Sequence, residues 1–395
     1  MVTEQKRDIR SGSVIAVVAI LLAAVNLRLA VTSVGPVLAE IRSGLGMSGT
    51  VAGLLTSLPV VCFASVGFAA PRLARRFGAA AVVASGLVVL ALGLAIRPYA
   101  PSTLTFVLFS GVALGGIAVV NVLLPMIVKE RFASRTGMMT GLYSLSLNLG
   151  AAVAAGATVP LTVALNDDWR LGLATWAVLA VLAVPPWLAL SRDRAPVTLG
   201  DQPPPPPLRV IREPVAWALA VYFGMQSTSA YVIIGWLPQI YRDAGLTAET
   251  AGVLFAVTSF LGVPLGFVVT TYAGRVRSQS LIALGLGVAG IAGYGGLWLD
   301  PAAAPWIWAI LLGIGNCAFP LVLTMITLRG RTPATVVRLS AFGQGVGYLI
   351  AIPGPILVGV LHDATHGWRL PLTLMVAPMI PQVIAGVQAG RDRQI

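Results

Sequence analysis

Charged residues are scarce in this 395-residue chain, where Asp, Glu, Lys and Arg together make up only 10% of the sequence. A soluble domain carries about 25% charged residues, so this chain lacks the polar surface that folding in water requires. Hydrophobic residues instead make up 57% of it. The shortage of charge excludes a soluble enzyme, a nucleic-acid-binding module and a disordered scaffold, and it indicates a polytopic protein of the lipid bilayer.

Cysteine and histidine are also nearly absent, which removes several kinds of site. Cys62 and Cys317 lie inside apolar segments, so neither a disulfide framework nor a cysteine-based metal site is supported. We interpret the two histidines, His362 and His366, as exposed residues at the outer end of a predicted span. An embedded catalytic triad therefore has no base. We expect no enzyme activity, no metal and no cofactor.

Long apolar runs dominate the sequence. A helix needs about 20 apolar residues to cross about 30 Å of hydrocarbon, and twelve runs of that kind are present, with Arg28 inside the first and Arg369 at the start of the last. The predicted spans are residues 13–38, 50–70, 79–96, 102–128, 137–163, 171–190, 214–237, 250–272, 279–298, 305–328, 339–361 and 368–389. The sequence therefore predicts an all-α membrane protein with twelve transmembrane helices.

Lysine and arginine are distributed unevenly among the predicted loops. Most of the 26 basic residues fall on the side that also holds both chain termini. The positive-inside rule places that side in the cytoplasm of a multi-pass cell-membrane protein. The net charge of +12 is thereby explained without a nucleic-acid partner. The opposite side is predicted to hold Arg42, Arg97, Arg170, Arg242 and Arg369.

Two features divide the chain into halves. Five consecutive prolines at residues 203–207 lie in the longest predicted cytoplasmic connection, and such a run favours an extended polyproline II spacer. We therefore predict an N-terminal six-helix bundle over residues 1–190, a proline-rich linker over 191–213 and a C-terminal six-helix bundle over 214–395.

The two halves also share spaced motifs. Residues 46–53 parallel residues 245–252, and Asn121-x-x-x-Pro125 in the fourth predicted span parallels Asn316-x-x-x-Pro320 in the tenth. Recurrence at the equivalent helix six spans later indicates a parallel duplication of a six-helix unit. We expect the two bundles to be pseudo-symmetric.

Twelve spans in two parallel repeats resemble the major facilitator superfamily of transporters. The loop between spans two and three of that superfamily usually reads Gly-x-x-x-Asp-Arg-x-Gly-Arg-Arg. This chain has Pro71 at the position of the acid and Ala74 at the position of the second glycine. The resemblance implies a conformational loop motif, without the usual acidic partner, formed by Gly67, Arg72, Arg75 and Arg76.

A narrower resemblance covers nearly the whole chain. The segments 26–28, 32–36, 121–125 and 342–345 look like those of the cyanate permease and 2-nitroimidazole transporter branch, although Leu29 replaces a proline that the branch usually has. The resemblance implies a protein that usually works as a monomer. It also implies a substrate that is a cyanate-like anion or a nitroimidazole-like heteroaromatic.

Arg28 lies near the middle of the first predicted span, where an arginine costs roughly 2.5–3.5 kcal/mol on insertion scales. None of the 14 Asp and Glu residues lies at mid-depth in a predicted span. An anionic or strongly dipolar substrate is therefore a natural partner for the planar guanidinium. The alternative is an arginine that bonds backbone carbonyls at a broken helix near Gly35 and Pro36. The same lack of embedded acids argues against antiport of cationic drugs.

Other polar and aromatic residues near mid-depth could complete a substrate site, although amides also bond neighbouring helices and aromatic rings also pack structurally. The hypothesis is a secondary active or facilitative transporter of a small anionic or polar solute, in which two halves rock around a mid-membrane site. The alternative is an exporter of neutral or anionic antimicrobial compounds. The predicted substrate-binding residues are Arg28, Asn26, Thr32, Asn121, Tyr143, Asn148, Gln226, Tyr231, Asn316, Phe319, Gln344 and Tyr348.

Overall fold

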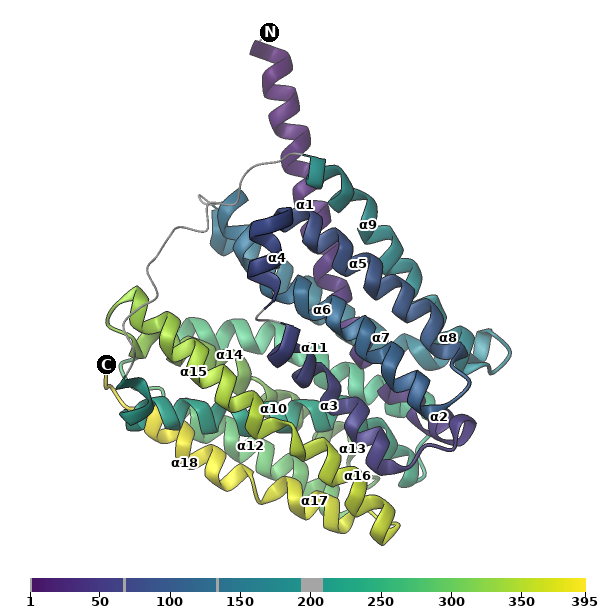
Figure 1. Cartoon of the computed structure of the whole chain (residues 1–395). Helices are drawn as coiled ribbons and strands as arrows, with labels where there is room; N and C mark the ends of the chain where they lie inside the picture. Colours follow the sequence, from purple (N-terminus) through teal and green to yellow (C-terminus); the bar gives the residue numbers. More distant parts are fainter. Residues whose placement is uncertain (1, 67–68, 133–134, 193–208) are drawn as a thin grey trace. The chain divides into compact units, whose positions relative to one another are not determined.

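The computed structural model describes residues 2–66, 69–132, 135–192 and 209–395, and all the regular elements in these ranges are helices (Figure 1). Eleven segments in the described ranges are long and apolar enough to cross a membrane, and the further apolar helix Gly49–Phe63 is shorter. These segments account for the twelve expected spans. The predicted all-α membrane fold is confirmed.

The chain packs into two compact units. The first comprises residues 1–34 and 61–201, and the second comprises residues 35–60 and 202–395. The first unit contains α1 (Val2–Thr32), α4 (Ala70–Phe77), α5 (Ala79–Ile96), a 3₁₀ turn (Arg97–Tyr99), α6 (Thr103–Arg131), α7 (Thr136–Ala164), α8 (Trp169–Thr175) and α9 (Ala177–Arg192).

The second unit begins in the N-terminal half of the sequence. Residues 35–60 pack with the C-terminal half, although the sequence analysis assigns them to the N-terminal bundle. The predicted domain division stays a prediction, and residues 193–208 of the predicted linker lie outside the described residues. The elements are a 3₁₀ turn (Gly35–Val37), α2 (Leu38–Leu45), most of α3 (Gly49–Val66), a 3₁₀ turn (Arg209–Arg212), α10 (Pro214–Asp243), α11 (Ala248–Ala273), α12 (Ser280–Leu299), α13 (Pro305–Asn316), α14 (Ala318–Arg329), α15 (Pro333–Ala351), α16 (Pro353–Thr365), α17 (Arg369–Val376) and α18 (Met379–Ala389).

Several spans of the second unit consist of two helices joined at a break. α15 ends just before Pro353, and α17 is separated from α18 by Pro378. α13 ends at Asn316, and the proline four residues later, Pro320, has no N–H to donate to the Asn316 carbonyl. Each of these breaks thus lies at or near a proline, whereas Pro238 and Pro264 of the same unit lie inside unbroken helices.

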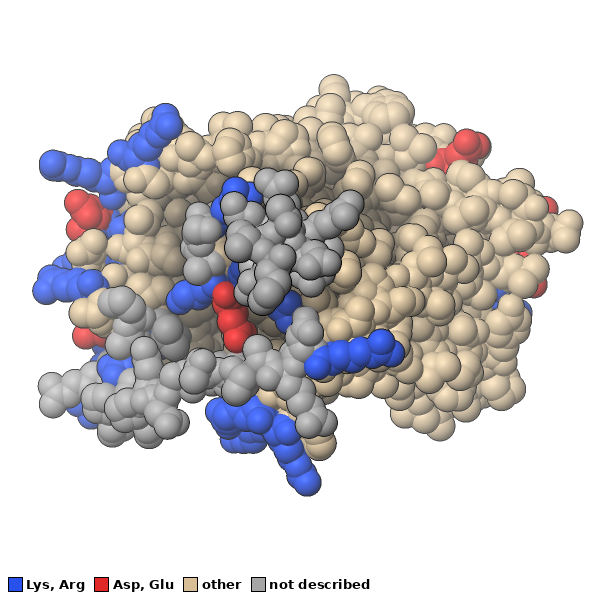
Figure 2. All heavy atoms as spheres, turned by 90° about the horizontal axis from the view of Figure 1, so that it is seen from above, with Lys and Arg blue, Asp and Glu red and all other residues tan. Residues whose placement is uncertain are grey.

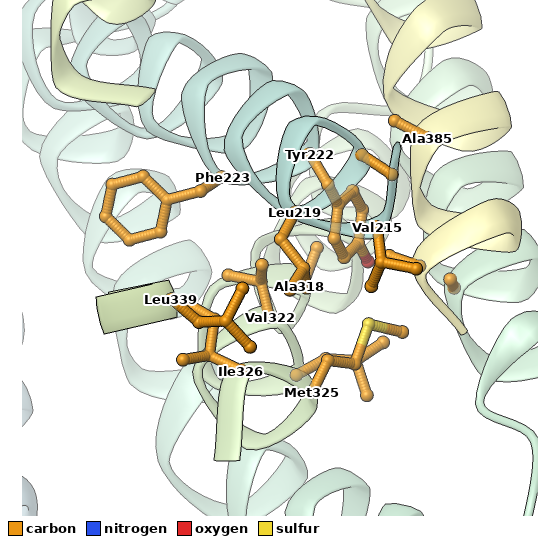
Figure 3. Close-up of a cluster of buried hydrophobic side chains, with 14 of the residues drawn as sticks. Val215, Leu219, Tyr222, Phe223, Ala318, Val322, Met325, Ile326, Leu339 and Ala385 are labelled. Carbon is orange, nitrogen blue, oxygen red and sulfur yellow. The ribbon is translucent and has the colours of Figure 1, made fainter. Parts of the chain in front are cut away.

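A tightly packed apolar core joins α10, α14, α15 and α18 in the second unit, as Figure 3 shows. Because lipid chains are as apolar as these side chains, close packing between helices stabilises such a core more than removal from water does. Figure 3 labels Val215, Leu219, Tyr222, Phe223, Ala318, Val322, Met325, Ile326, Leu339 and Ala385.

Charge pairs and glycines hold residues 35–60 within the second unit. Arg242 of α10 donates to both carboxylate oxygens of Glu40, at 2.9 and 2.7 Å, and Arg42 donates to Asp363 at 3.1 Å. At Gly53 of α3, an added Cβ would overlap the carbonyl of Pro355 in α16. This part of the unit therefore depends on paired charges and on a helix contact that only glycine permits.

Exposed basic residues gather on α4 and the last turn of α6 in the first unit. Figure 2, viewed from above Figure 1, shows many Lys and Arg side chains and few acidic ones on the face seen. The predicted orientation in the membrane rests on this distribution of basic residues, and the orientation itself stays a prediction. The exposed basic residues of these two helices are Arg72, Arg75, Arg76, Lys129 and Arg131.

Candidate functional site

Arg28 lies in α1, inside the candidate span Val14–Leu45, and its side chain is half-buried. Thr32, one helical turn later, donates its hydroxyl to the Arg28 carbonyl at 2.9 Å and is itself 1% exposed. The α-helix continues to Thr32, so Arg28 lies one turn before the end of α1 and about two turns before Gly35. The Thr32 hydroxyl is engaged by its own helix, which favours a structural role for that residue.

The helices around α1 carry further predicted site residues of the first unit. α7 packs so closely on α1 that a Cβ at Gly150 would overlap the Val25 carbonyl, and α6 also contacts α1. Asn121 of α6 and Tyr143 of α7 are half-buried. The structure therefore places half-buried hydrogen-bonding side chains on the two helices that pack beside Arg28's own helix.

Asn148 and Asn26 make contacts typical of amides that support helices. The Nδ2 of Asn148 donates to the Ser144 carbonyl at 2.8 Å. Asn26 is 1% exposed, and its Nδ2 donates to the carbonyls of Leu22 at 2.9 Å and of Leu179 in α9 at 3.1 Å. The Asn26 side chain therefore joins two helices of the first unit, which favours the structural reading of this residue.

In the second unit, Gln226 and Asn316 are in direct contact. Gln226 of α10 is 2% exposed, and its Nε2 donates to the Asn316 Oδ1 at 2.7 Å. Asn316, at the end of α13, is half-buried. Gln382 of α18 donates its Nε2 to the Gln226 Oε1 at 3.0 Å. The sequence analysis missed Gln382, although a glutamine inside an apolar span was a usable signal.

The predicted aromatic residues of the second unit pack on Phe223. The ring centroid of Phe223 lies 5.6 Å from that of Phe319 and 5.0 Å from that of Tyr348. Tyr231 is half-buried elsewhere on α10. Gln344 donates its Nε2 to the Ser340 hydroxyl of the same helix at 2.6 Å. Phe319 and Tyr348 thus share one aromatic cluster.

The predicted loop motif forms helix α4 over its described part. Arg72, Arg75 and Arg76 are exposed there, and the Arg76 guanidinium lies over the Phe77 ring at 5.2 Å. Gly67, the remaining member of the motif, lies outside the described residues. The structure therefore places the three arginines on the surface of the first unit.

Two residues assigned to the outer side differ from expectation. His362 is not an exposed loop residue, because it lies in α16 half-buried, with Nε2 3.6 Å from the Asp243 carboxylate and its ring centroid 4.4 Å from that of Trp368. Arg97, assigned to a loop, is 1% exposed and donates to the Ala30 carbonyl at 3.2 Å. Polar partners on adjacent helices draw both side chains inward.

Metal chemistry finds no support among the described residues, since no group of three or more His, Cys, Asp or Glu side chains could hold an ion there. The site residues instead offer one guanidinium, several amides and aromatic rings. Such a set can bind and orient a small solute by hydrogen bonds and stacking. It contains no nucleophile activated by an adjacent base.

Comparisons with known proteins agree on the family. The chain is 38% identical to transporter YycB of Bacillus subtilis (strain 168) over 382 residues, which cover 95% of this chain and 93% of that protein. It is 34% identical to the 2-nitroimidazole transporter of Escherichia coli (strain K12), covering 97% of each chain. It is also 34% identical to the cyanate transport protein CynX of the same organism, covering 89% of this chain and 91% of that one.

Solved structures show the same fold. The crystal structure of a D-xylose–proton symporter superposes with a TM-score of 0.71 at 13% identity, and the match covers 95% of this chain and 96% of that one. At that identity the likeness concerns the fold alone. The model of the Major Facilitator Superfamily matches residues 20–355. Since this match spans most of a chain that also has full-length relatives above 30% identity, the protein belongs to the Major Facilitator Superfamily.

Proposed function

We propose that this membrane transporter carries a small anion of the size class of cyanate, and that Arg28 provides the positive charge that binds it. The observation that carries the proposal is a half-buried arginine within the first candidate span, on an unbroken stretch of α1. A guanidinium stays charged at every physiological pH and presents a planar fork of donors that suits small anions.

The surroundings of α1 support an anion more than a cation. Asn121 and Tyr143 are half-buried on α6 and α7, which pack against α1, and both side chains can donate hydrogen bonds. The relative CynX is named a cyanate transport protein. A permanent positive charge within the membrane repels cations, so selection by charge at Arg28 follows from Coulomb's law at low dielectric.

A second candidate substrate is a nitroimidazole-like heteroaromatic, which the protein would export as an antimicrobial compound. Phe319 and Tyr348, which are half-buried and pack on the buried Phe223, support it, because flat aromatic solutes stack on such rings. A relative with 34% identity is named a 2-nitroimidazole transporter. Under this candidate, loss of Phe319 would weaken binding more than loss of Arg28.

Four further parts complete the proposal. The protein lies in the cell membrane with both termini in the cytoplasm, it works as a monomer, and it transports by alternating access. The exposed arginines of α4, Arg72, Arg75 and Arg76, belong to a loop that changes partners during the cycle. The basic predicted cytoplasmic loops support the orientation.

Binding of anions to the purified protein tests the proposal. We would measure the melting temperature with cyanate, thiocyanate and 2-nitroimidazole for the wild type and for Arg28→Ala. We expect cyanate to raise the melting temperature of the wild type and to have little effect on the folded variant, because the charge that binds it is gone. Loss of a charge-assisted hydrogen bond corresponds to about 1.5–3 kcal/mol of binding free energy.

Arg192→Ala is the matched control, because it removes the same charge from an exposed position at the end of α9. The control should respond to cyanate like the wild type. Equal stabilisation of wild type and Arg28→Ala by cyanate would contradict a binding role for Arg28. Stabilisation by 2-nitroimidazole alone would favour the second candidate.

A further inference from the structure

Three amide side chains, two of them buried, form a directed chain across the second unit. Gln382 donates from Nε2 to the Gln226 Oε1 at 3.0 Å, and Gln226 donates from Nε2 to the Asn316 Oδ1 at 2.7 Å. Gln382 and Gln226 are each 2% exposed, whereas Asn316 is half-buried. Each amide can accept through its oxygen and donate through its nitrogen, so the orientation of the Gln382 amide sets that of Gln226 and, through it, that of Asn316. In this arrangement the Asn316 NH₂ group can donate to another acceptor.

The break after α13 favours this direction of the chain. Pro320 has no N–H, so the backbone carbonyl of Asn316 lacks its usual helical donor. The Gln226 Nε2 lies 3.5 Å from that carbonyl as well as 2.7 Å from the Asn316 Oδ1. Reversing the Gln226 amide would place its oxygen against the free carbonyl oxygen. The proline of the Asn-x-x-x-Pro motif thus helps to select which face the Asn316 amide presents.

A small cavity with both polar and apolar lining residues lies beside Gln382 and Gln226, where this chain of amides begins. Its volume is about 10 Å³, and its lining includes Gln226, Gln382, Ser229 and Tyr294. The Gln382 Oε1 is buried and has no hydrogen-bond partner among the described residues, while the hydroxyls of Ser229 and Tyr294 lie 2.9 Å apart. A cavity of this size and polarity fits one water molecule, which can donate to an unpartnered buried oxygen.

We propose that Gln382 and Gln226, with one water molecule in this cavity, are positioning residues that hold the Asn316 amide with its NH₂ group toward the transported anion. The proposal rests on the proposed anion function and concerns residues of the second unit alone. Asn316 is then the binding residue, since it alone of the three is half-exposed. Gln226, predicted from sequence as a substrate ligand, acts through Asn316.

The geometry distinguishes this arrangement from a purely structural bond between helices. A helix-joining amide such as Asn26 bonds backbone carbonyls, whose direction is the same whatever the function. Gln382, Gln226 and Asn316 instead bond side chain to side chain, so the last amide can face either way and is oriented only by the others. Such a network pre-organises a donor for an anion.

We call Gln382, Gln226 and Asn316 together the relay, and uptake of radiolabelled cyanate into proteoliposomes tests it through the KM. We would compare wild type, Gln382→Leu, Asn316→Ala and the double variant, with melting temperatures measured in parallel. Each single substitution should raise the KM about tenfold, the loss expected for one hydrogen bond to a charged group. The double variant should show no larger KM than Asn316→Ala alone, because Gln382 acts through Asn316. Gln388→Leu, exposed on the same helix, is the control and should leave the KM unchanged.

Pro320→Ala provides a test that does not remove a buried side chain from the network. It restores an N–H donor four residues after Asn316, so the carbonyl no longer selects the orientation of Gln226. We expect a raised KM for cyanate and no loss of thermal stability, since a helix tolerates alanine better than proline. A structural role for the amides predicts no change in KM in this variant.

The outcomes separate the relay from the function on which it rests. Uptake that is lost in Arg28→Ala but shows an unchanged KM in Gln382→Leu and Pro320→Ala would overturn the relay alone. KM increases that multiply in the double variant would also overturn it, because they would show independent action. Absence of cyanate uptake by the wild type would overturn the anion function and the relay together.

Discussion

At the scale of single residues, hydrogen-bond partners distinguish residues that bind the substrate from residues that hold helices together. Asn26 satisfies its Nδ2 group with two carbonyls, one of them in α9. Asn26→Ala should therefore lower the free energy of unfolding by about 0.6–2 kcal/mol. The KM for cyanate should stay unchanged, and denaturation and uptake measured on the same preparation check both results. A raised KM at unchanged stability would instead assign Asn26 to the substrate.

The sequence identified the kinds of residue at the candidate site but not their partners. A charged or amide side chain inside an apolar run is conspicuous, so Arg28, Gln226 and Asn316 could be selected without a structure. Whether an amide joins two helices or stays half-exposed depends on the packing of helices that are distant in sequence. Gln226 and Gln382 are 156 residues apart, and no local pattern links them.

At the scale of helices, glycine positions determine which pairs of helices can touch. An added Cβ at Gly53 of α3 would overlap the Pro355 carbonyl, whereas none of the surrounding atoms lies within 4 Å of one at Gly262 of α11. Gly53→Leu should lower the free energy of unfolding by about 1–3 kcal/mol through overpacking. Gly262→Leu should change it little. Equal melting temperatures for the two variants would contradict the tight contact.

The sequence predicts which segments are helical more completely than it predicts where helices break and which helices pack together. Apolar run length gave the candidate spans, because a bilayer demands about 20 apolar residues per helix. The breaks at Asn316, before Pro353 and at Pro378 lie at or near prolines, but Pro238 and Pro264 lie inside unbroken helices, so the proline rule alone could not have located the breaks. The clustering of residues 35–60 with the C-terminal half could not, since it depends on charge pairs such as Arg242 with Glu40.

At the scale of the whole molecule, basic loops predict the orientation in the membrane. A fluorescent protein fused after Ile395 should fold and fluoresce, because the positive-inside rule places the C-terminus in the cytoplasm. A periplasmic phosphatase reporter fused after Asp167, in a predicted outer loop, should be active. The same two reporters exchanged between these positions are the control. An active phosphatase at the C-terminus would contradict the orientation.

The family follows from features that extend over the whole chain, whereas the substrate depends on a few side chains. Span count, the proline-rich connection and the repeated Asn-x-x-x-Pro motif pointed to the Major Facilitator Superfamily, and the match over residues 20–355 confirms it. The substrate depends on one guanidinium and a small number of amides. Their charge predicts an anion and their number predicts a small one.

The central claim is that Arg28 selects and carries an anion. The most direct measurement is the initial rate of radiolabelled cyanate uptake into proteoliposomes containing wild type, Arg28→Lys or Arg28→Ala at matched protein content. We predict saturable uptake by the wild type, partial uptake with Lys, which keeps the charge without the planar fork, and none above background with Ala. Saturable uptake by Arg28→Ala at the wild-type rate and KM would contradict the claim.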